Sequence, residues 1–295
     1  MTARRKSVFA FAASDPSVVV LASRLRWEEK AILDTLESRA LTYQVVDPRT
    51  MLAALDEPLQ WHGIALSREI SHTRAVYTAL SLEHAGVRVI NSARALEICG
   101  DKWRTALALR SAGLPTPRTM LALTPEAARD AAEEFGYPLV FKPLVGSWGR
   151  RVALIRDPDA ADAVLEYCSA MPAPQAHLLC VQEVVGRLGQ DIRVIVVGGE
   201  VLGAVRRVAR NGWKANVALG AEAQPCRLSD ADADLAIKAV RATGAEIGGV
   251  DLLERMDGEL CVLEVNAGVE FRGFSDATGI DVARAIVNYV LEVRR

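Results

Sequence analysis

The sequence predicts a protein of α/β and α+β type, and three observations carry this prediction. Over the first ninety residues, short apolar runs alternate with amphipathic segments, a rhythm typical of an open parallel sheet. A glycine loop between two strand-like runs then indicates a compact α+β unit. The C-terminal part joins strand-like runs through glycine turns, which favours antiparallel pairing. A length of 295 residues suits two or three subdomains.

The first region, residues 1–92, is expected to form the parallel sheet. Buried strands are expected over 18–21, 42–46, 63–66 and 87–90, and helices over 28–39 and 74–85. Gly86 follows the second helix, where a left-handed cap is expected. No glycine-rich dinucleotide fingerprint follows the first strand, so a dinucleotide cofactor is not expected in this region.

The second region, residues 93–185, is expected to be the α+β unit. Helices are expected over 102–112, 125–135 and 158–167, and strands over 139–142, 152–155 and 178–183. Thr124 and Pro125 supply an N-cap and a first-turn proline for the second helix, and Gly136 ends it. The glycine loop lies between the first two strands.

The third region, residues 186–295, is expected to begin with strands. These strands are expected over 191–197 and 201–208, around a Gly198-Gly199 turn. A capping box at Ser229 opens a helix that runs to residue 243, and a final helix over 277–293 is interrupted near Gly279. Between these two helices lies a β-hairpin.

The hairpin places two acidic residues opposite each other. Asp257-Gly258 is a favoured two-residue turn, so Met256 is expected to oppose Glu259. Counting back in step puts Asp251 opposite Glu264. Directly opposed like charges destabilise a sheet, so this pair needs a cation or a shared proton.

Asn266 shares the face of Asp251 and Glu264, because side chains two residues apart on a strand point the same way. Two carboxylates and one amide suit a hard cation such as Mg2+, which completes its shell with water and substrate phosphate. In the alternative interpretation, one carboxylate turns to solvent or pairs with an arginine. A bulge would break the assumed register.

A phosphate-binding loop is indicated upstream. The run Gly146-Ser147-Trp148-Gly149 offers backbone N–H groups with little obstruction, and Lys142 just before it supplies a cation. The loop is not a Walker A motif, because it lies between strands and lacks that residue order. Taken alone, it is equally the pattern of an ordinary turn, and Lys142 and Lys102 are equally ordinary solvated lysines.

Arg193 is the one charge inside the strand 191–197. A guanidinium there can clamp a carboxylate or a transferring phosphate with two hydrogen bonds. An edge-strand salt bridge with Asp or Glu is the alternative.

Composition argues against several classes of protein. The net charge of −2 gives no global field that attracts nucleic acid, and no apolar run approaches the ~18 residues of a membrane span. The apolar run 8–13 is too short for a signal peptide. The five cysteines lack disulfide or zinc spacing. A cytoplasmic protein without nucleic-acid or membrane partners is expected.

The chain resembles the ATP-grasp ligases over essentially its whole length, because it carries their motifs in the same order. The shared motifs, in order, are Asp101-Lys102, Lys142-Pro143 before the glycine loop, Gln182-Glu183, Asp191-Ile192-Arg193, and the set Asp251, Glu264 and Asn266. The resemblance implies an ATP-grasp fold. Its parts would be an N-terminal open-sheet domain over 1–92, a central lid domain over 93–185, and a C-terminal ATP-grasp domain with the metal site over 186–295.

The chain is most similar to the branch that contains the ribosomal-protein glutamate ligase and, nearer still, the LysX-type ligases. The latter attach the α-amino group of an amino acid to a carrier protein. The loop 142–150 with Trp148 and the segment 264–272 resemble that subgroup.

The resemblance implies a two-step ligation. ATP phosphorylates the side-chain carboxylate of a C-terminal glutamate on a small acidic amino-group carrier protein, and the amine of an amino acid then attacks the acyl phosphate. The amino acid is expected to be 2-aminoadipate or glutamate, the cofactors ATP and two Mg2+ ions, and the assembly a homodimer or homotetramer. The alternatives are a glutamate ligase acting on a protein tail or a small-molecule acid, and a catalytically weak nucleotide-binding regulator.

The resemblance also assigns site residues. The ATP-binding set is Lys102, Lys142, Gly146, Ser147, Trp148, Gly149, Arg150, Gln182, Glu183, Val184 and Val185. The metal set is Asp251, Glu264 and Asn266, and the catalytic set is Lys142, Arg193 and Asn216. The substrate set is Arg193, Glu270, Phe271 and Arg272. Glu183 or a nearby acid is expected at the ribose, and an arginine at the carboxylate of the amino acid.

The segment after Asn216 departs from the family pattern. These ligases continue with Arg-Gly-Gly, whereas this chain has Leu219-Gly220-Ala221. Four basic residues precede it, namely Arg206, Arg207, Arg210 and Lys214. The first two and the lysine are candidates to replace the missing charge. The four together are expected either to receive an acidic carrier tail or to form a solvated face.

Overall fold

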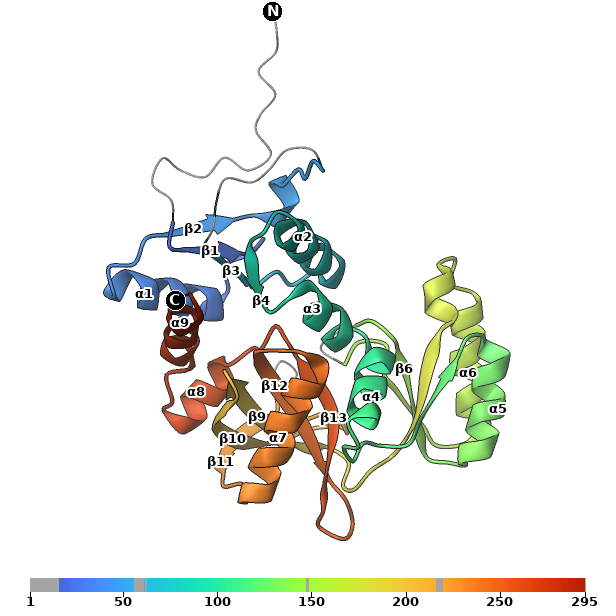
Figure 1. The fold of residues 1–295 in the computed structure, drawn as a ribbon. Helices are drawn as coiled ribbons and strands as arrows, with labels where there is room; N and C mark the ends of the chain where they lie inside the picture. The colour runs from blue at the N-terminus through green and yellow to red at the C-terminus, as the bar shows by residue number, and fades with distance from the viewer. Residues whose placement is uncertain (1–15, 56–60, 62, 147–148, 216–219, 295) are drawn as a thin grey trace, which may run out of the picture.

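The computed structural model describes residues 16–55, 61, 63–146, 149–215 and 220–294. Its strands form three sheets, and each sheet is built from one continuous stretch of the chain (Figure 1). Within these described ranges, no helix is both long and apolar enough to cross a bilayer.

The first sheet is parallel, with strand order β2-β1-β3-β4. It contains β1 (Val18–Leu21), β2 (Tyr43–Val46), β3 (Ile64–Ser67) and β4 (Arg88–Ile90), with helices α1 (Trp27–Ser38) and α2 (His72–His84) and the 3-10 turn η1 (Pro48–Thr50). The predicted parallel sheet and the left-handed Gly86 (φ +84°) are confirmed. The carboxyl ends of parallel strands meet at one edge, and there the backbone N–H of Arg68 donates to the carbonyl of Leu21.

The second sheet is antiparallel, with strand order β5-β8-β6-β7. It contains β5 (Thr119–Ala122), β6 (Leu139–Pro143), β7 (Ala153–Ile155) and β8 (Leu179–Glu183), with helices α5 (Pro125–Phe135) and α6 (Pro158–Ser169) and the 3-10 turn η2 (Pro174–His177). Helices α3 (Ala93–Cys99) and α4 (Lys102–Ser111) precede it. Sequence analysis missed β5 and α3, because both are short and lack a clear period.

The third sheet is also antiparallel, with strand order β11-β10-β9-β12-β13. It contains β9 (Gln190–Val197), β10 (Glu200–Val208), β11 (Glu222–Cys226), β12 (Ile247–Glu254) and β13 (Leu260–Asn266), with helices α7 (Asp230–Thr243), α8 (Arg272–Thr278) and α9 (Val282–Val293). The left-handed Gly279 separates α8 from α9, which confirms the predicted interruption, but α8 begins at Arg272 instead of residue 277, and β11 was not predicted. Helices α4 and α7 cover one face (Figure 1). Helix α9 packs beside α1 of the first sheet (Figure 1).

The β12–β13 hairpin confirms the central register but not the predicted turn. Arg255 donates its backbone N–H to the carbonyl of Glu259, so the loop has three residues and the predicted opposition of Met256 and Glu259 is wrong. A bulge at Leu263 then shifts the pairing by one residue. The two irregularities cancel, and Asp251 pairs with Glu264.

Asn91, just after β4, connects the first sheet to the third. Its Nδ2 donates to the carbonyls of Ile247 (2.7 Å) and Ala267 (2.9 Å). Its Oδ1 accepts from the backbone N–H groups of Glu246 (2.7 Å) and Ile247 (3.0 Å). Four backbone groups that frame the start of β12 and the end of β13 therefore depend on one buried side chain.

Asn91→Ala is expected to lower the free energy of unfolding by about 3 kcal/mol, because it leaves buried backbone donors and acceptors unpaired. Urea denaturation followed by tryptophan fluorescence measures this change. Asn288→Ala is the matched control, since Asn288 is exposed on α9 and its replacement is expected to change stability by less than about 0.5 kcal/mol. Equal stability of the two variants would contradict the role of Asn91.

Candidate active site

A cavity of about 490 Å3 is lined by residues of all three sheets. Its lining includes Ser67 in β3, Lys142 in β6, Gln182 in β8, Arg193 in β9, Asp251 in β12 and Glu264 in β13. Charged groups that converge on one concave space are the usual mark of a ligand site.

Two predicted lysines line the cavity. Lys142 ends β6, and its Nζ donates to Oε1 of Gln182 at 2.5 Å. Burial lowers the pKa of the Lys142 ammonium to about 8. The Nζ of Lys102 donates to the carbonyl of Gly146 at 2.9 Å. The two ammonium groups therefore give this part of the wall a positive charge.

The described ends of the glycine loop are each held by a lysine. Lys102 bonds the carbonyl of Gly146, and the Nζ of Lys214 donates to the carbonyl of Gly149 at 2.8 Å. Gly146 and Gly149 both line the cavity, whereas Arg150 is exposed and does not. The predicted site residues Ser147, Trp148 and Asn216 lie outside the described residues.

The metal set gathers on one face of the β12–β13 pair. Nδ2 of Asn266 lies 3.4 Å from Oε1 of Glu264 and 3.5 Å from Oδ2 of Asp251. Glu264 makes no ion pair with any described residue. Two carboxylates and an amide around one point fit Mg2+, with the remaining ligands left to water and phosphate oxygens. No group of three or more Asp, Glu, His or Cys side chains that could hold a metal ion occurs in the described ranges, so this face relies on two carboxylates and an amide.

Asp251 is also paired with two arginines, as the alternative interpretation held. Arg193 binds it through Nε–Oδ1 (2.5 Å) and Nη2–Oδ2 (3.0 Å), and Nη2 of Arg207 lies 2.9 Å from Oδ1. Burial alone would raise the pKa of Asp251, but these two guanidiniums hold it below its usual value. The alternative for Arg193 is therefore half right, because the arginine does pair with an aspartate, but on β9, the central strand, and not on an edge strand.

Arg207 belongs to the cavity rather than to a surface patch. It is 6% exposed, and its Nε and Nη2 each lie 2.6 Å from an oxygen of Asp191. Burial raises the pKa of Asp191 to about 6, although Arg207 opposes the shift. The other basic residues have separate partners, with Arg206 on Glu254, Arg210 on Glu222 and Lys214 on the glycine loop. The prediction that these four basic residues form a single face is therefore wrong.

The end of β8 forms another part of the lining, through Gln182, Glu183, Val184 and Val185. Oε1 of Glu183 accepts from the backbone N–H of Arg118 at 2.7 Å. One oxygen of this carboxylate is therefore engaged, which leaves the other for a sugar contact. Asp191 also lines the cavity, but both of its oxygens are bound by Arg207.

The segment after β13 divides between the cavity and the core. Glu270 lines the cavity. Phe271 is 1% exposed and packs edge-on against Trp27 at 5.8 Å between ring centroids, so it supports the core and does not line the cavity. The Arg272 side chain is exposed and 3.8 Å from Asp276, outside the lining. Two of the three predicted substrate residues of this segment are therefore not at the cavity.

Sequence analysis missed four charged residues of the lining, Arg26, Arg68, Glu69 and Arg187. Arg68 and Glu69 directly follow β3. Ligands of open α/β sheets bind beyond the carboxyl ends of the strands, so the Ser67-Arg68-Glu69 run was the available signal.

Two family models match the chain. The LysX preATP-grasp domain matches residues 18–98, and the RimK-like ATP-grasp domain matches residues 99–290. Among solved structures, a RimK domain ATP-grasp protein from Sphaerobacter thermophilus has a TM-score of 0.79 and 28% identity, with 93% of this chain and 99% of that chain covered.

Two curated relatives align along nearly their whole length. Glutamate–LysW ligase ArgX of Sulfurisphaera tokodaii is 37% identical over 278 residues, which cover 93% of this chain and 98% of that protein. Alpha-aminoadipate–LysW ligase LysX of Sulfolobus acidocaldarius is 32% identical over 272 residues, with 91% and 99% covered.

Proposed function

The chain belongs to the RimK-like ATP-grasp family and is an ATP-dependent ligase, and from this premise we propose that it joins the α-amino group of an amino acid to the C-terminal glutamate of a small acidic carrier protein. The observation that carries the proposal is one cavity that contains a lysine pair, an acid–amide face and a wall of arginines. The full-length similarity to two LysW ligases supports the choice of a carrier protein as acceptor.

The residues of the cavity match the needs of phosphoryl transfer. Lys102 and Lys142 would neutralise the ATP phosphates, and the end of β8 at 182–185 would receive the adenine. Asp251, Glu264 and Asn266 would hold Mg2+, which neutralises phosphate charge when bound. The glycine loop, held at both ends by lysines, would exclude water from the acyl phosphate.

Arg193 and Arg207 would stabilise the reacting acyl group. The carrier carboxylate attacks the γ-phosphorus of ATP and releases ADP, and the amine then attacks the acyl carbon and releases phosphate. Both steps develop negative charge on oxygen, which fixed guanidiniums stabilise. Arg193 and Arg207 are already oriented by Asp251 and Asp191, and Arg207 would supply the charge of the arginine that the family has after Asn216.

Glutamate is the proposed amino acid. Two glutamate–LysW ligases share 37% and 36% identity with the chain, whereas three alpha-aminoadipate–LysW ligases share 30–32%. A reducing compartment, the cytoplasm, is proposed, because all five cysteines are unpaired.

The proposal is tested by measuring ADP release with ATP, Mg2+ and single amino acids, with and without a small acidic carrier that ends in glutamate. Multiple-turnover ADP release is expected only when carrier and amino acid are both present, and to be faster with glutamate than with 2-aminoadipate. A carrier whose final residue is glutamine is the matched control, since it lacks the carboxylate that is phosphorylated. Equal ADP release with this control would contradict the proposal.

Lys142 gives a pH-dependent prediction. Its pKa of about 8 in the free protein is below the ordinary lysine value, and bound polyphosphate raises it again. ATP binding at pH 8 is therefore expected to take up about half a proton, and ATP affinity to fall as the pH rises above 8. Calorimetry in two buffers of different ionisation enthalpy measures the uptake. Lys142→Arg, which stays charged, is expected to remove it, and an unchanged uptake in that variant would refute the assignment.

A further inference from the structure

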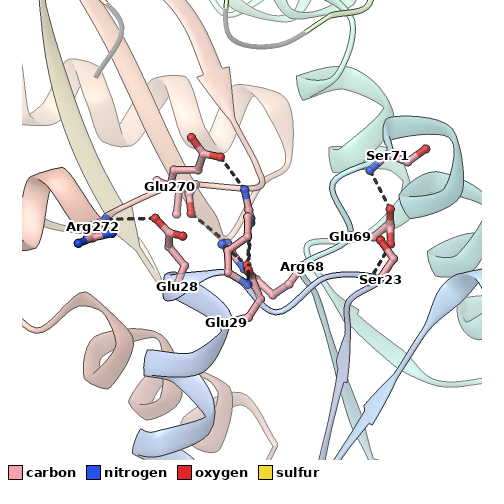
Figure 2. Close-up of polar contacts among 10 residues, drawn as sticks. Ser23, Glu28, Glu29, Arg68, Glu69, Ser71, Glu270 and Arg272 are labelled. Atoms are coloured by element: carbon pink, nitrogen blue, oxygen red, sulfur yellow. Dashed lines mark hydrogen bonds and ion pairs between the residues drawn. The ribbon is translucent and has the colours of Figure 1, made fainter. Parts of the chain in front are cut away.

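The part of the cavity wall that comes from the first sheet carries a charged cluster that the proposed ATP site does not use. Arg26, Arg68, Glu69 and Glu270 all line the cavity. Arg26 precedes α1. Arg68 and Glu69 follow β3, and Glu270 follows β13 (Figure 2). A molecule bound to this cluster would share the cavity with Glu264 and the site of phosphoryl transfer.

Glu29 fixes the positions of both arginines. Its Oε1 accepts from Nε of Arg68 at 2.9 Å and from Nη2 of Arg26 at 3.0 Å, and its Oε2 accepts from Nε of Arg26 at 3.0 Å. Glu29 is fully buried, and although burial raises its pKa, the hydrogen bonds from Arg26 and the charge of Arg68 lower it overall. One carboxylate shared by two guanidiniums leaves this trio with a net positive charge.

Arg68 depends on Glu29 for charge compensation. Its side chain is 2% exposed, and Nη1 donates to the carbonyl of Val269 at 3.0 Å. Its Nη2 lies 2.9 Å from Oε1 of Glu29 and has no other partner among the described residues, so Glu29 is the one carboxylate that compensates the charge of Arg68. Because Glu29 is shared with Arg26, a ligand carboxylate bound nearby would add to this compensation.

The contact between Arg26 and Glu270 is exchangeable. Nη1 of Arg26 donates to Oε1 of Glu270 at 2.5 Å, and the Glu270 side chain is 40% exposed. Exposed ion pairs contribute little net free energy, so an entering anion can replace Glu270 at small cost. The buried contacts with Glu29 would stay in place.

Glu69 shapes the wall instead of offering a free carboxylate. Its Oε2 accepts from the backbone N–H of Ser23 at 3.1 Å, and its Oε1 accepts from the backbone N–H of Ser71 at 2.8 Å (Figure 2). Nη2 of Arg74 also donates to Oε1, at 3.1 Å. The two arginines, Arg26 and Arg68, are therefore the charged groups of the cluster that can attract a ligand.

We propose that Arg26 and Arg68, positioned by Glu29, bind a carboxylate of the amino-acid substrate. This inference rests on the proposed ligase function. The carboxylate takes the place of Glu270 at Nη1 of Arg26. The buried guanidinium of Arg68, held on the same Glu29 oxygen as Arg26, adds positive charge beside it.

The position of the cluster suits the amine-bearing substrate. Arg68 is bonded to Val269, three residues beyond Asn266 of the metal set. A substrate anchored there by its carboxylate lies beside the strand at which the acyl phosphate would form. Its amine, deprotonated for attack, leaves it with negative charge only, and the positive trio around Glu29 offsets part of that charge.

The test measures kcat/KM of Arg26→Gln for glutamate, for glutamine and for the α-amide of glutamate, each with ATP and the carrier. The wild type is expected to prefer glutamate to one of the two amides by about 10- to 100-fold, the range for a lost charge-assisted hydrogen bond. In Arg26→Gln that preference is expected to fall to within about three-fold of unity, with the KM for ATP unchanged. A merely structural role would lower activity without changing the ratio between substrates.

Arg88→Gln is the matched control, because Arg88 forms an arginine–glutamate pair with Glu246 away from the cavity, and its substrate preferences are expected to stay those of the wild type. If Arg26→Gln does not fold, Glu270→Gln replaces it, and the KM for glutamate is expected to fall, since the competing carboxylate is gone. An unchanged preference in Arg26→Gln, or an unchanged or raised KM in Glu270→Gln, overturns the proposal. Carrier-dependent ADP release by the wild type tests the ligase function separately.

Discussion

Glu264→Gln is expected to reduce ATP turnover at least about 1,000-fold and to change the free energy of unfolding by less than about 0.5 kcal/mol. The carboxylate forms no salt bridge with a described residue, although it favours the charged form of the buried Lys142, so its loss leaves no bound guanidinium uncompensated. A site for Mg2+ does depend on this charge, because an amide is a weaker ligand for a hard cation than a carboxylate.

Steady-state ADP release and urea denaturation measure the two effects of Glu264→Gln. Glu259→Gln is the matched control, since Glu259 is an exposed carboxylate on the same hairpin, and both of its values are expected to match the wild type. Turnover of Glu264→Gln near the wild-type rate would remove Glu264 from the metal set.

Asp251→Asn is expected to have a second, structural effect. It faces Glu264 directly, and relief of like-charge repulsion alone would make both substitutions neutral or stabilising. Asp251, however, compensates the buried charges of Arg193 and Arg207, and removing one partner of a buried pair costs about 3–5 kcal/mol. Asp251→Asn is therefore expected to lose both turnover and stability.

Urea denaturation of Asp251→Asn and Glu264→Gln side by side measures this difference. The two residues are cross-strand neighbours, so each variant controls for the other. Equal stability of the two variants would contradict the role given to the arginine pair.

Local patterns predicted most of the fold and the acid–amide face of the site. The opposition of Asp251 and Glu264 was predicted for an incomplete reason, because the three-residue turn and the bulge at Leu263 each shift the register and cancel. Neither irregularity has a clear signal in the sequence, whereas Asp257-Gly258 does signal a turn.

The arginines were harder to place from sequence. Arg206 and Arg207 are adjacent, and adjacent residues on a strand point to opposite faces, so treating them as one cluster was wrong. The pairing of Arg207 with Asp251 depends on the order of β9, β10 and β12 in the sheet. To place Arg26 and Arg68 at the site, one must know which sheet edge faces the cavity. That is a feature of the tertiary structure, and no local sequence pattern predicts it.

Intact-mass measurement of the carrier protein tests the central claim most directly. After incubation with the enzyme, ATP, Mg2+ and glutamate, the carrier is expected to gain the mass of one glutamate residue, with one ADP released per modified carrier. Omission of ATP, or use of Glu264→Gln, is expected to prevent the gain. A carrier of unchanged mass despite ADP release would contradict the account.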